Sequence, residues 1–430
     1  MARQGWGLAA CMGAAVTFSM MLVNPEVAQG QAVIPSTTQR QPVSGPGTNI
    51  IPSLTLSERY DSNVYFIQGA NLEDYVTTAS PQLRVVHKRQ LVEATVIGGA
   101  TAEAYVKNPG LNYAAANGSV DLNLGGAMSE LVRGLGLRIS DNFYYTPQLP
   151  AFAEPTGGGG TAPESFVQGL QAQRANAFTN TGIVAGSYAM SPLVTLTSTY
   201  NNAYRHFGNQ IAPTSGSTQP LINTMFQTVN SGPQIRLSAV DTVTLLHQYQ
   251  QADFGGSRSG FTTQGGTAGW TRVLTPTLTS SLTGGGTVLS QSNQLQYIGS
   301  ASLTWKFENT DAMVSYSRAV APSFFGSTTS VAGSGTALVS QVVTVNAAHH
   351  ITQALSVSIN GNYSFSESTP DSSVQQFTSY SVTPDVAYQI NRVMKTTLAY
   401  TRSHFERTFS SQESSFDRNA VILRLFAEWE

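Results

Sequence analysis

Residues 355–365 read LSVSINGNYSF, and apolar and small polar side chains alternate along this stretch without interruption. One set of alternate positions consists of Leu355, Val357, Ile359, Gly361, Tyr363 and Phe365, and the other consists of Ser356, Ser358, Asn360, Asn362 and Ser364. Because successive side chains of a β-strand point to opposite faces, a period of two predicts a strand with one apolar and one polar face. The polar face carries hydroxyl and amide groups where a soluble β-sandwich would present Lys and Glu to bulk water. Such a polar face suits an enclosed, wet interior, and such an apolar face suits lipid.

The same alternation recurs from residue 49 to residue 430, and segments 91–106 and 417–430 show it clearly. Residues rich in Gly, Pro, Asn, Asp and Ser interrupt the pattern every ten to fourteen residues. The short interruptions fall near 89–90, 128–129, 191–192, 240–241, 275–276, 308–311, 352–353 and 391–392. The longer ones fall near 61–73, 107–112, 145–175, 207–222, 255–259, 291–294, 323–335, 367–374 and 408–416. Long and short connections therefore alternate, as in barrels with short periplasmic turns and longer outer loops.

This spacing predicts the fold class: an all-β, transmembrane, antiparallel up-and-down β-barrel of about eighteen strands, with sixteen as the alternative count. In lipid, closure of the first strand on the last leaves no backbone donor or acceptor unpaired at a free edge. A barrel of this size is too wide for its own side chains to fill, so we expect an aqueous passage unless loops occupy it.

Aromatic residues support the predicted orientation. They lie late in the strands that run toward the outer loops, at Tyr60, Phe143, Tyr144, Tyr200, Tyr204, Tyr249, Tyr363 and Phe365. They also lie late in the strands that run back, at Trp270, Trp305, Phe307, Tyr388 and Trp429. Two belts of amphipathic rings at opposite membrane interfaces are typical of transmembrane barrels. Core packing of these rings in a soluble sandwich is the alternative.

The composition excludes several other classes. The 430 residues are 11 % charged and 41 % hydrophobic, whereas soluble domains carry about 25 % charged residues. A balance of 22 Lys and Arg against 24 Asp and Glu, without a basic cluster, argues against nucleic acid as a partner. The abundance of Tyr and Phe argues against disorder. Cys11 is the sole cysteine, so the chain has no disulfide framework.

The N-terminus predicts export. Arg3 precedes an apolar run from residue 8 to residue 23, and small residues that suit cleavage follow it. We therefore expect a signal peptide over 1–32, a flexible periplasmic lead-in over 33–48 and an outer-membrane barrel over 49–430. Two alternatives remain: lipidation at Cys11, because Leu8 to Cys11 resembles a lipoprotein cleavage box, and an uncleaved membrane anchor. The predicted location is the bacterial outer membrane, with membrane lipid and the outer-membrane assembly machinery as partners.

The sequence shows no catalytic constellation. The histidines are His87, His206, His247, His349, His350 and His404, and they are scattered over different segments. Neither a G-x-S-x-G elbow nor an H-E-x-x-H motif occurs, and the glycines at 157–160 are not followed by the Lys-Ser/Thr of a phosphate loop. His349 and His350 are adjacent and so point to opposite faces of a strand, which disfavours a shared metal site. We expect no enzyme activity, no metal and no cofactor.

The polar face supplies the candidate functional residues. The ionisable side chains predicted to line the lumen are Arg84, Glu93, Glu103, Asp121, Arg138, Arg236, Lys306, Asp385 and Arg424. Because both signs occur in near balance, we expect weak ion selectivity and a lining suited to neutral, hydroxyl-rich solutes. Pairing of these charges across the wall is the structural alternative. The longest predicted loop, 145–175, could fold inward as in general porins and set Glu154 and Glu164 against Arg84, Arg138 or Arg236; a mobile surface loop is the alternative.

Two segments carry a resemblance to a known family. Residues 54–64, LTLSERYDSNV, resemble the opening of a family of outer-membrane β-barrel porins, which begin with an apolar strand, a Glu-x-Tyr and an Asp-x-Asn. Residues 417–425, DRNAVILRL, with the ending AEWE at 427–430, are similar to the last strand of that family. Outer-membrane barrels commonly end on an aromatic residue, whereas here Trp429 is penultimate and Glu430 is last.

Members of that family are often associated with exopolysaccharide production and export systems, so the resemblance implies a barrel involved in polysaccharide secretion or outer-membrane transport. The expected function is therefore a passive channel for saccharides or exported polysaccharide, and saccharide or polysaccharide is the expected solute partner. A non-conducting scaffold barrel of an envelope polysaccharide machine is the second hypothesis. Glu58, Tyr60, Asp61 and Asn63 are candidates for a rim site that binds sugar or a cation, with turn chemistry plus an interfacial ring as the alternative.

Overall fold

The computed structural model describes residues 47–65, 73–148, 175–210, 222–255, 260–322, 337–369, 375–409 and 412–429. These residues form one sheet of 18 strands. The strands are β1 (Gly47–Asp61), β2 (Asp74–Lys88), β3 (Glu93–Tyr105), β4 (Tyr113–Asn123), β5 (Leu135–Gln148), β6 (Ala175–Ala189), β7 (Val194–Gln210), β8 (Thr224–Arg236), β9 (Asp241–Phe254), β10 (Phe261–Thr275), β11 (Leu278–Leu289), β12 (Gln294–Phe307), β13 (Thr310–Pro322), β14 (Ala337–His350), β15 (Leu355–Thr369), β16 (Gln375–Gln389), β17 (Met394–Phe409) and β18 (Gln412–Glu428).

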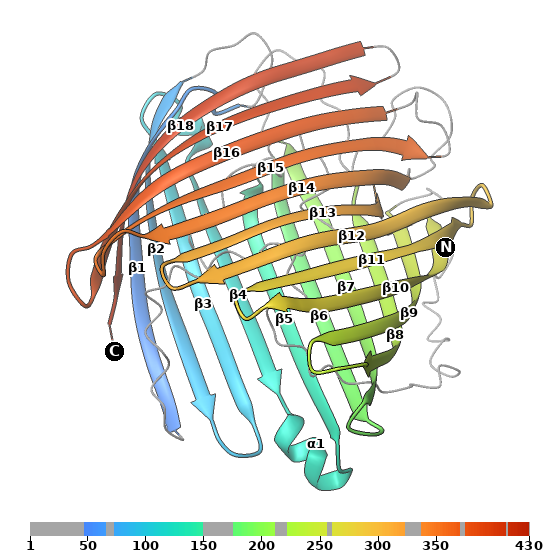
Figure 1. Ribbon diagram of the computed structural model, residues 1–430. Coiled ribbons are helices and arrows are strands. Elements are labelled where there is room, and N and C mark those ends of the chain that lie inside the picture. The colour runs from blue at the N-terminus through green and yellow to red at the C-terminus, as the bar shows by residue number, and fades with distance from the viewer. Residues whose placement is uncertain are drawn as a thin grey trace, which may run out of the picture.

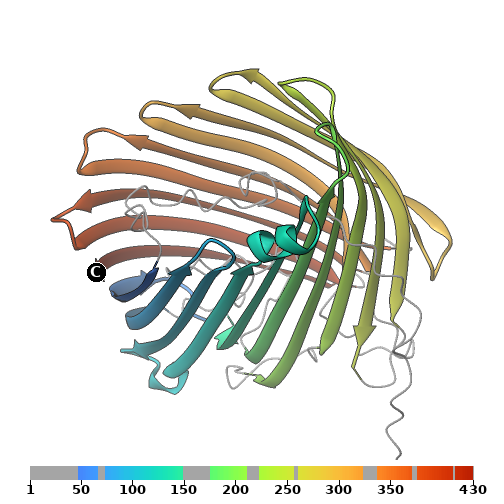
Figure 2. The same ribbon diagram turned by 90° about the horizontal axis from the view of Figure 1, so that it is seen from below.

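Each strand pairs antiparallel with its neighbours in sequence, and the sheet closes because β1 also pairs with β18. The closing register sets Leu54 opposite Ala427 and Asp61 opposite Ala420. Figure 1 shows β18 beside β1 on one side of the cylinder, and Figure 2 views the barrel from the end at which the short helix α1 lies. The predicted closed barrel of eighteen strands is therefore confirmed.

We call the two ends of the barrel the turn end and the loop end. The turn end carries connections at the predicted places, and only the one at 124–134 is much longer than predicted; the connections are 89–92, 124–134, 190–193, 237–240, 276–277, 308–309, 351–354 and 390–393. On the loop end, residues 290–293 form a tight turn with Asn293 at a φ of 52°, close to the predicted connection at 291–294. The connection predicted at 408–416 is much shorter than expected, because only residues 410–411 separate β17 from β18. There the alternation extends into the segment predicted as a loop, where Phe405 pairs with Phe416.

The connection near Met128 contains a feature that the sequence pattern did not predict, the short α-helix α1 (Gly125–Leu131). Seven residues are too few to show helical periodicity. The backbone amide of Ala127 donates to the Leu91 carbonyl in the neighbouring turn. A Cβ atom at Gly126 would lie 2.5 Å from the Gln90 carbonyl oxygen, so this close approach of helix and turn requires glycine.

The wall separates two kinds of surface. Large exposed apolar side chains lie on one face of the strands, as at Ile359 and Leu423, and we call this the outer face. Among the described residues, no helix is long and apolar enough to cross a membrane. A closed barrel with an apolar outer face and aromatic residues near both ends of its strands is the arrangement of an outer-membrane barrel.

The aromatic belts follow the prediction with one correction. Phe143 lies on the outer face, opposite Asn180 and next to Gly118. Tyr144 is the next residue and therefore lies on the inner face, opposite Asn117 and Thr179. The prediction that both rings belong to one belt was wrong, because adjacent residues of a strand cannot share a face. Trp270, Trp305 and Trp429 are all exposed, as lipid-interface rings should be.

Candidate functional site

The inner face of the barrel is the candidate functional site. It consists of the alternate residues of each strand whose side chains do not point to the outer face. The cross-strand pairing connects these residues from strand to strand around the whole closed sheet. Long side chains meet on this face across an intervening strand. Arg59 of β1 reaches Glu103 of β3, and Arg84 of β2 reaches Glu428 of β18. Such contacts suit the concave side of the curved sheet.

The register places all nine predicted lumen residues on the inner face. Arg84 lies opposite Ile97, Glu93 lies opposite both Lys88 and Asn123, and Asp121 lies opposite Thr95. The remaining residues occupy the same set of alternate positions: Glu103 on β3, Arg138 on β5, Arg236 on β8, Lys306 on β12, Asp385 on β16 and Arg424 on β18. They are distributed around the circumference and do not converge on one point.

In the turn half of the barrel, Arg84 and Arg138 form ion pairs and Asp385 accepts a hydrogen bond from an uncharged neighbour. The Arg84 guanidinium lies 3.0 Å from the Glu428 carboxylate. The Arg138 guanidinium lies 2.9 Å from the Asp121 carboxylate on the adjacent strand, and the Ser358 hydroxyl donates to Asp385. The lining of this half is therefore polar but locally balanced in charge.

In the loop half, a buried network crosses the seam at which the first and last strands close. Arg418 of β18 donates from Nε and Nη2 to both oxygens of Asp61 on β1, at 2.8 to 3.1 Å. Arg59 lies 3.6 Å from the same carboxylate and donates to Glu103, which also accepts a 2.8 Å hydrogen bond from the Tyr105 hydroxyl. We call Arg418, Asp61, Arg59, Glu103 and Tyr105 the seam network. It ties together β18, β1 and β3 at positions almost closed to water.

Sequence reasoning did not identify Arg59, Tyr105 or Arg418 as site residues. All three fall on inward positions, so the alternation of the strands could have indicated their face. Nothing in the sequence, however, indicates that residues 357 positions apart form an ion pair. That contact follows from the closing register alone.

The inner face of β14 to β17 is dominated by hydroxyl and amide groups. Three pairs of these hydroxyl groups hydrogen-bond to each other across neighbouring strands: Ser364 with Ser379 at 2.6 Å, Ser366 with Ser340 at 2.9 Å, and Thr383 with Thr401 at 2.9 Å. We call this part of the lining the hydroxyl wall; its members include Ser340, Thr344, Asn346, Ser358, Asn360, Asn362, Ser364, Ser366, Ser379, Ser381, Thr383, Thr401 and Ser403. Groups of this kind can donate and accept hydrogen bonds without adding charge.

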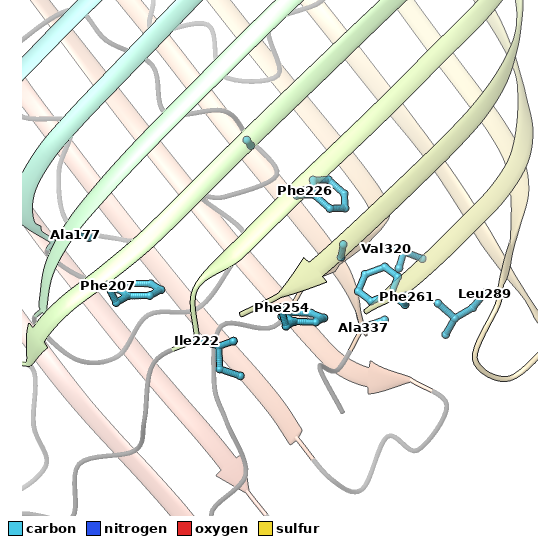
Figure 3. Close-up of a cluster of buried hydrophobic side chains, with 11 residues drawn as sticks. Ala177, Phe207, Ile222, Phe226, Phe254, Phe261, Leu289, Val320 and Ala337 are labelled. Atoms are coloured by element: carbon cyan, nitrogen blue, oxygen red, sulfur yellow. The ribbon is translucent and has the colours of Figure 1, made fainter. Parts of the chain in front are cut away.

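An apolar cluster of buried residues lies near the loop end, with members on β6 to β11 and on β13 and β14 (Figure 3). Phe226, Phe254, Phe261 and Leu289 are each no more than 5 % exposed. The seam network and part of the hydroxyl wall in the same half are equally buried. The loop half of the interior is therefore packed, whereas the turn half leaves charged side chains such as Arg138 exposed.

The four rim candidates do not form one site. Glu58 and Tyr60 lie on the outer face, where Glu58 accepts a hydrogen bond from Thr77 and Tyr60 donates to Glu73. Asp61 lies on the inner face in the seam network, and the Asn63 side-chain amide donates to the backbone carbonyl of Asp417. The first two residues are separated from the other two by the strand itself, because their side chains lie on opposite faces of it.

Beside this rim, an exposed ion pair links the connections that flank β2 and β3. The Lys107 ammonium hydrogen-bonds to the Glu73 carboxylate, which also accepts the Tyr60 hydroxyl. The hydrogen bond from Lys107, and next to it that from Tyr60, lowers the pKa of Glu73 below its ordinary value.

Two further predictions concern other residues. Glu154 and Glu164, the candidates for a constriction loop, lie outside the described residues. His349 and His350 point to opposite faces of β14, and His349 pairs with Thr310. In the part of the chain that the structure describes, no group of three or more His, Cys, Asp or Glu side chains could hold a metal ion.

Comparison with known proteins gives structural likeness only. No protein-family model matches the sequence, and no curated protein sequence is similar to it. Among solved structures, OccK2 (OpdF) of Pseudomonas aeruginosa is similar over 88 % of this chain and 98 % of its own, with a TM-score of 0.46 and 9 % identity. The same protein in complex with glucuronate gives a TM-score of 0.46 at 10 % identity over 89 % of this chain and 99 % of its own. The siderophore receptor PirA of Acinetobacter baumannii gives a TM-score of 0.45 at 8 % identity over 90 % of this chain and 81 % of its own.

Proposed function

We propose that this protein is a passive outer-membrane channel for saccharides or exported polysaccharide. The observation that supports the proposal is the hydroxyl wall, whose members on the inner face of β14 to β17 offer hydrogen bonds from uncharged groups. Neutral, hydroxyl-rich solutes exchange their hydrogen bonds with water for similar bonds to such a surface. The balanced ion pairs of the turn half give little reason for strong attraction of either anions or cations.

The packed loop half favours a second function, that of a non-conducting scaffold barrel in an envelope polysaccharide machine. Phe261, Leu289 and Arg418 on the inner face are each at most 2 % exposed, whereas an open water channel would wet such side chains. Under both proposals the association with exopolysaccharide comes from the family resemblance of residues 54–64 and 417–430.

Single-channel recording in planar bilayers separates the two functions. A passive saccharide channel gives discrete conductance steps, and added oligosaccharide blocks them transiently as it occupies the lumen. A barrel that inserts without any conductance, shown to be folded by its heat-modifiable migration in gels, contradicts the channel proposal and supports the scaffold.

A finer proposal is that the loop at 145–175 narrows the passage, with Glu154 and Glu164 facing Arg84, Arg138 or Arg236. Deletion of residues 152–163 should then raise the single-channel conductance. Unchanged conductance would contradict this constriction without affecting the proposal that the barrel conducts.

A further inference from the structure

Polar side chains interrupt the outer face on one side of the barrel. Asp141 on β5 pairs with Gly182 on β6, Gly182 pairs with Asn202 on β7, and Asn202 pairs with Gln227 on β8. Asp141 also lies opposite Val120, which is 38 % exposed on the outer face. We call these residues the polar row: Asp141, Gly182, Asn202 and Gln227, with Asn180 beside them.

On β5 to β8, apolar residues lie on both sides of the polar row, and beyond β8 the row continues into Gln251 of β9, which hydrogen-bonds to Asp253. One step toward the turn end, the outer face carries Ile139, Val184, Tyr200 and Val229 as cross-strand neighbours. One step toward the loop end it carries Phe143, Tyr204 and Met225 beside Asn180. Rings and aliphatic side chains therefore flank the row on both sides.

On the opposite part of the wall, charged residues of the outer face lie closer to the loop end than the aromatic residues. On β13, Arg318 lies two residues beyond Tyr316 toward the loop end, and on β17, Arg402 lies two residues beyond Tyr400 in the same direction. There the charged groups stand outside the aromatic belt, where headgroups and water reach them. On β5, by contrast, Asp141 lies on the turn side of both Phe143 and Tyr145, which places it toward the hydrocarbon.

A carboxylate on the lipid-facing surface of a barrel is unfavourable, and polar groups at such depth generally face protein or water. Asn180 meets part of this cost, because its side-chain amide donates to both oxygens of Asp141 at 2.9 and 3.2 Å. The amides of Asn202 and Gln227 extend the polar surface over two further strands. Aromatic residues and Met are enriched at contact surfaces between proteins, and polar side chains at membrane depth generally face protein or water.

We propose that the polar row is the contact surface between two copies of this chain in the membrane. A second copy inserted in the same direction presents the same row at the same depth. About a two-fold axis along the membrane normal, the β5 side of one row faces the β8 side of the other, and Gly182 and Asn202 lie nearest the axis. Because the strands of a membrane barrel are tilted, the two rows cross at this axis, so that the Asn202 amides of the two copies meet there and Gly182 has no side chain to keep the two walls apart.

Cysteine cross-linking tests this surface. Cys11 is the sole cysteine of the sequence, so variants are made in a Cys11→Ser background. Asn202→Cys lies within the row, and Val382→Cys is the matched control, because Val382 is 41 % exposed on the outer face of β16, across the barrel. In isolated outer membranes treated with copper phenanthroline, Asn202→Cys should give a disulfide-linked dimer several-fold more abundant than Val382→Cys gives. Equal cross-linking at the two positions would overturn the proposal.

A second measurement covers the case of an unfavourable thiol geometry. The purified parent barrel should have the mass of a dimer by light scattering in mild detergent, and Asp141→Leu combined with Asn202→Leu should give a folded monomer. A monomeric parent, or a double variant that keeps the dimer mass, contradicts the proposal. Neither result bears on whether the barrel conducts.

Discussion

Removal of Arg418 should destabilise the barrel far more than removal of an exposed arginine on the same inner face. Arg418 makes three hydrogen bonds to Asp61 across the closing seam, and the two side chains are 1 % and 2 % exposed. Loss of one partner from a buried ion pair costs about 3–5 kcal/mol, because the other charge stays buried. Since Arg59 remains 3.6 Å from the Asp61 carboxylate, we expect the lower end of that range, about 3 kcal/mol, for Arg418→Met.

The matched control is Arg138→Met. Arg138 is also an inner-face arginine paired with an aspartate at 2.9 Å, but its side chain is 54 % exposed. Exposed pairs contribute about 1 kcal/mol or less, so this variant should stay close to the parent. A third variant, Arg418→Met with Asp61→Leu, removes both charges and should recover most of the loss, because it leaves no unpaired carboxylate.

Denaturant titration of the barrel in lipid vesicles, followed by the fluorescence of Trp270, Trp305 and Trp429, measures the free energy of unfolding. The reasoning is refuted if Arg418→Met lies within about 1 kcal/mol of Arg138→Met, since the burial of the seam network would then have no energetic consequence.

Three further predictions follow from the described residues. Gly265→Ala should destabilise the barrel by about 1–3 kcal/mol in the same titration, because its Cβ atom would lie 2.1 Å from the Gly286 carbonyl oxygen. Gly284→Ala has nothing within 4 Å of its new Cβ atom and should be close to neutral; equal effects of the two substitutions would contradict this account. If the barrel conducts, its reversal potential in a KCl gradient should be near zero, and a strong preference for either ion would show that the balanced lining does not control permeation. The Glu73 carboxyl should titrate in NMR at a lower pH in the parent than in Lys107→Met, because Lys107 lowers its pKa. The stabilisation from this pair is present at neutral pH and is lost as the pH falls through that lowered pKa, so an unchanged Glu73 midpoint in Lys107→Met would show that the ion pair does not form in solution.

The strand pattern was predictable because the lipid-facing wall imposes it residue by residue. Ile359 and Leu423 must be apolar wherever their strands pair, so the face of each residue can be assigned without knowledge of the partner strand. The turns were predictable for a related reason, since each return of the chain needs residues such as those at 391–392. The loop ends were less predictable, because the pairing of β17 with β18 continues into the segment predicted as a loop.

The contacts of the inner face could not be predicted in the same way. The Arg418–Asp61 pair depends on the register between the first and last strands, and the Arg84–Glu428 pair depends on the same closure. The alternation of apolar and polar residues shows to which face of the wall a side chain points. It does not show which residue of a strand distant in the sequence lies beside that side chain. The prediction of one rim site failed for a simpler reason. Tyr60 and Asp61 are adjacent, so a strand conformation already implies that their side chains point to opposite faces.

The two proposed functions differ in what happens in the loop half of the barrel, where the inner face is packed. In the turn half, exposed pairs such as Arg138–Asp121 leave the inner face wet under either proposal. In the loop half, Phe226, Leu289 and Arg418 are buried, and the exclusion of water around Arg418 strengthens the seam network. We therefore expect a solute that crosses this barrel to meet the buried side chains of the loop half. The hydroxyl groups of Ser364, Ser366 and Ser379 in that half already satisfy one another, so a passing saccharide has to exchange these hydrogen bonds one at a time. Such exchange predicts slow permeation with long blocks by oligosaccharide, which distinguishes a packed conducting barrel both from an open pore and from a scaffold.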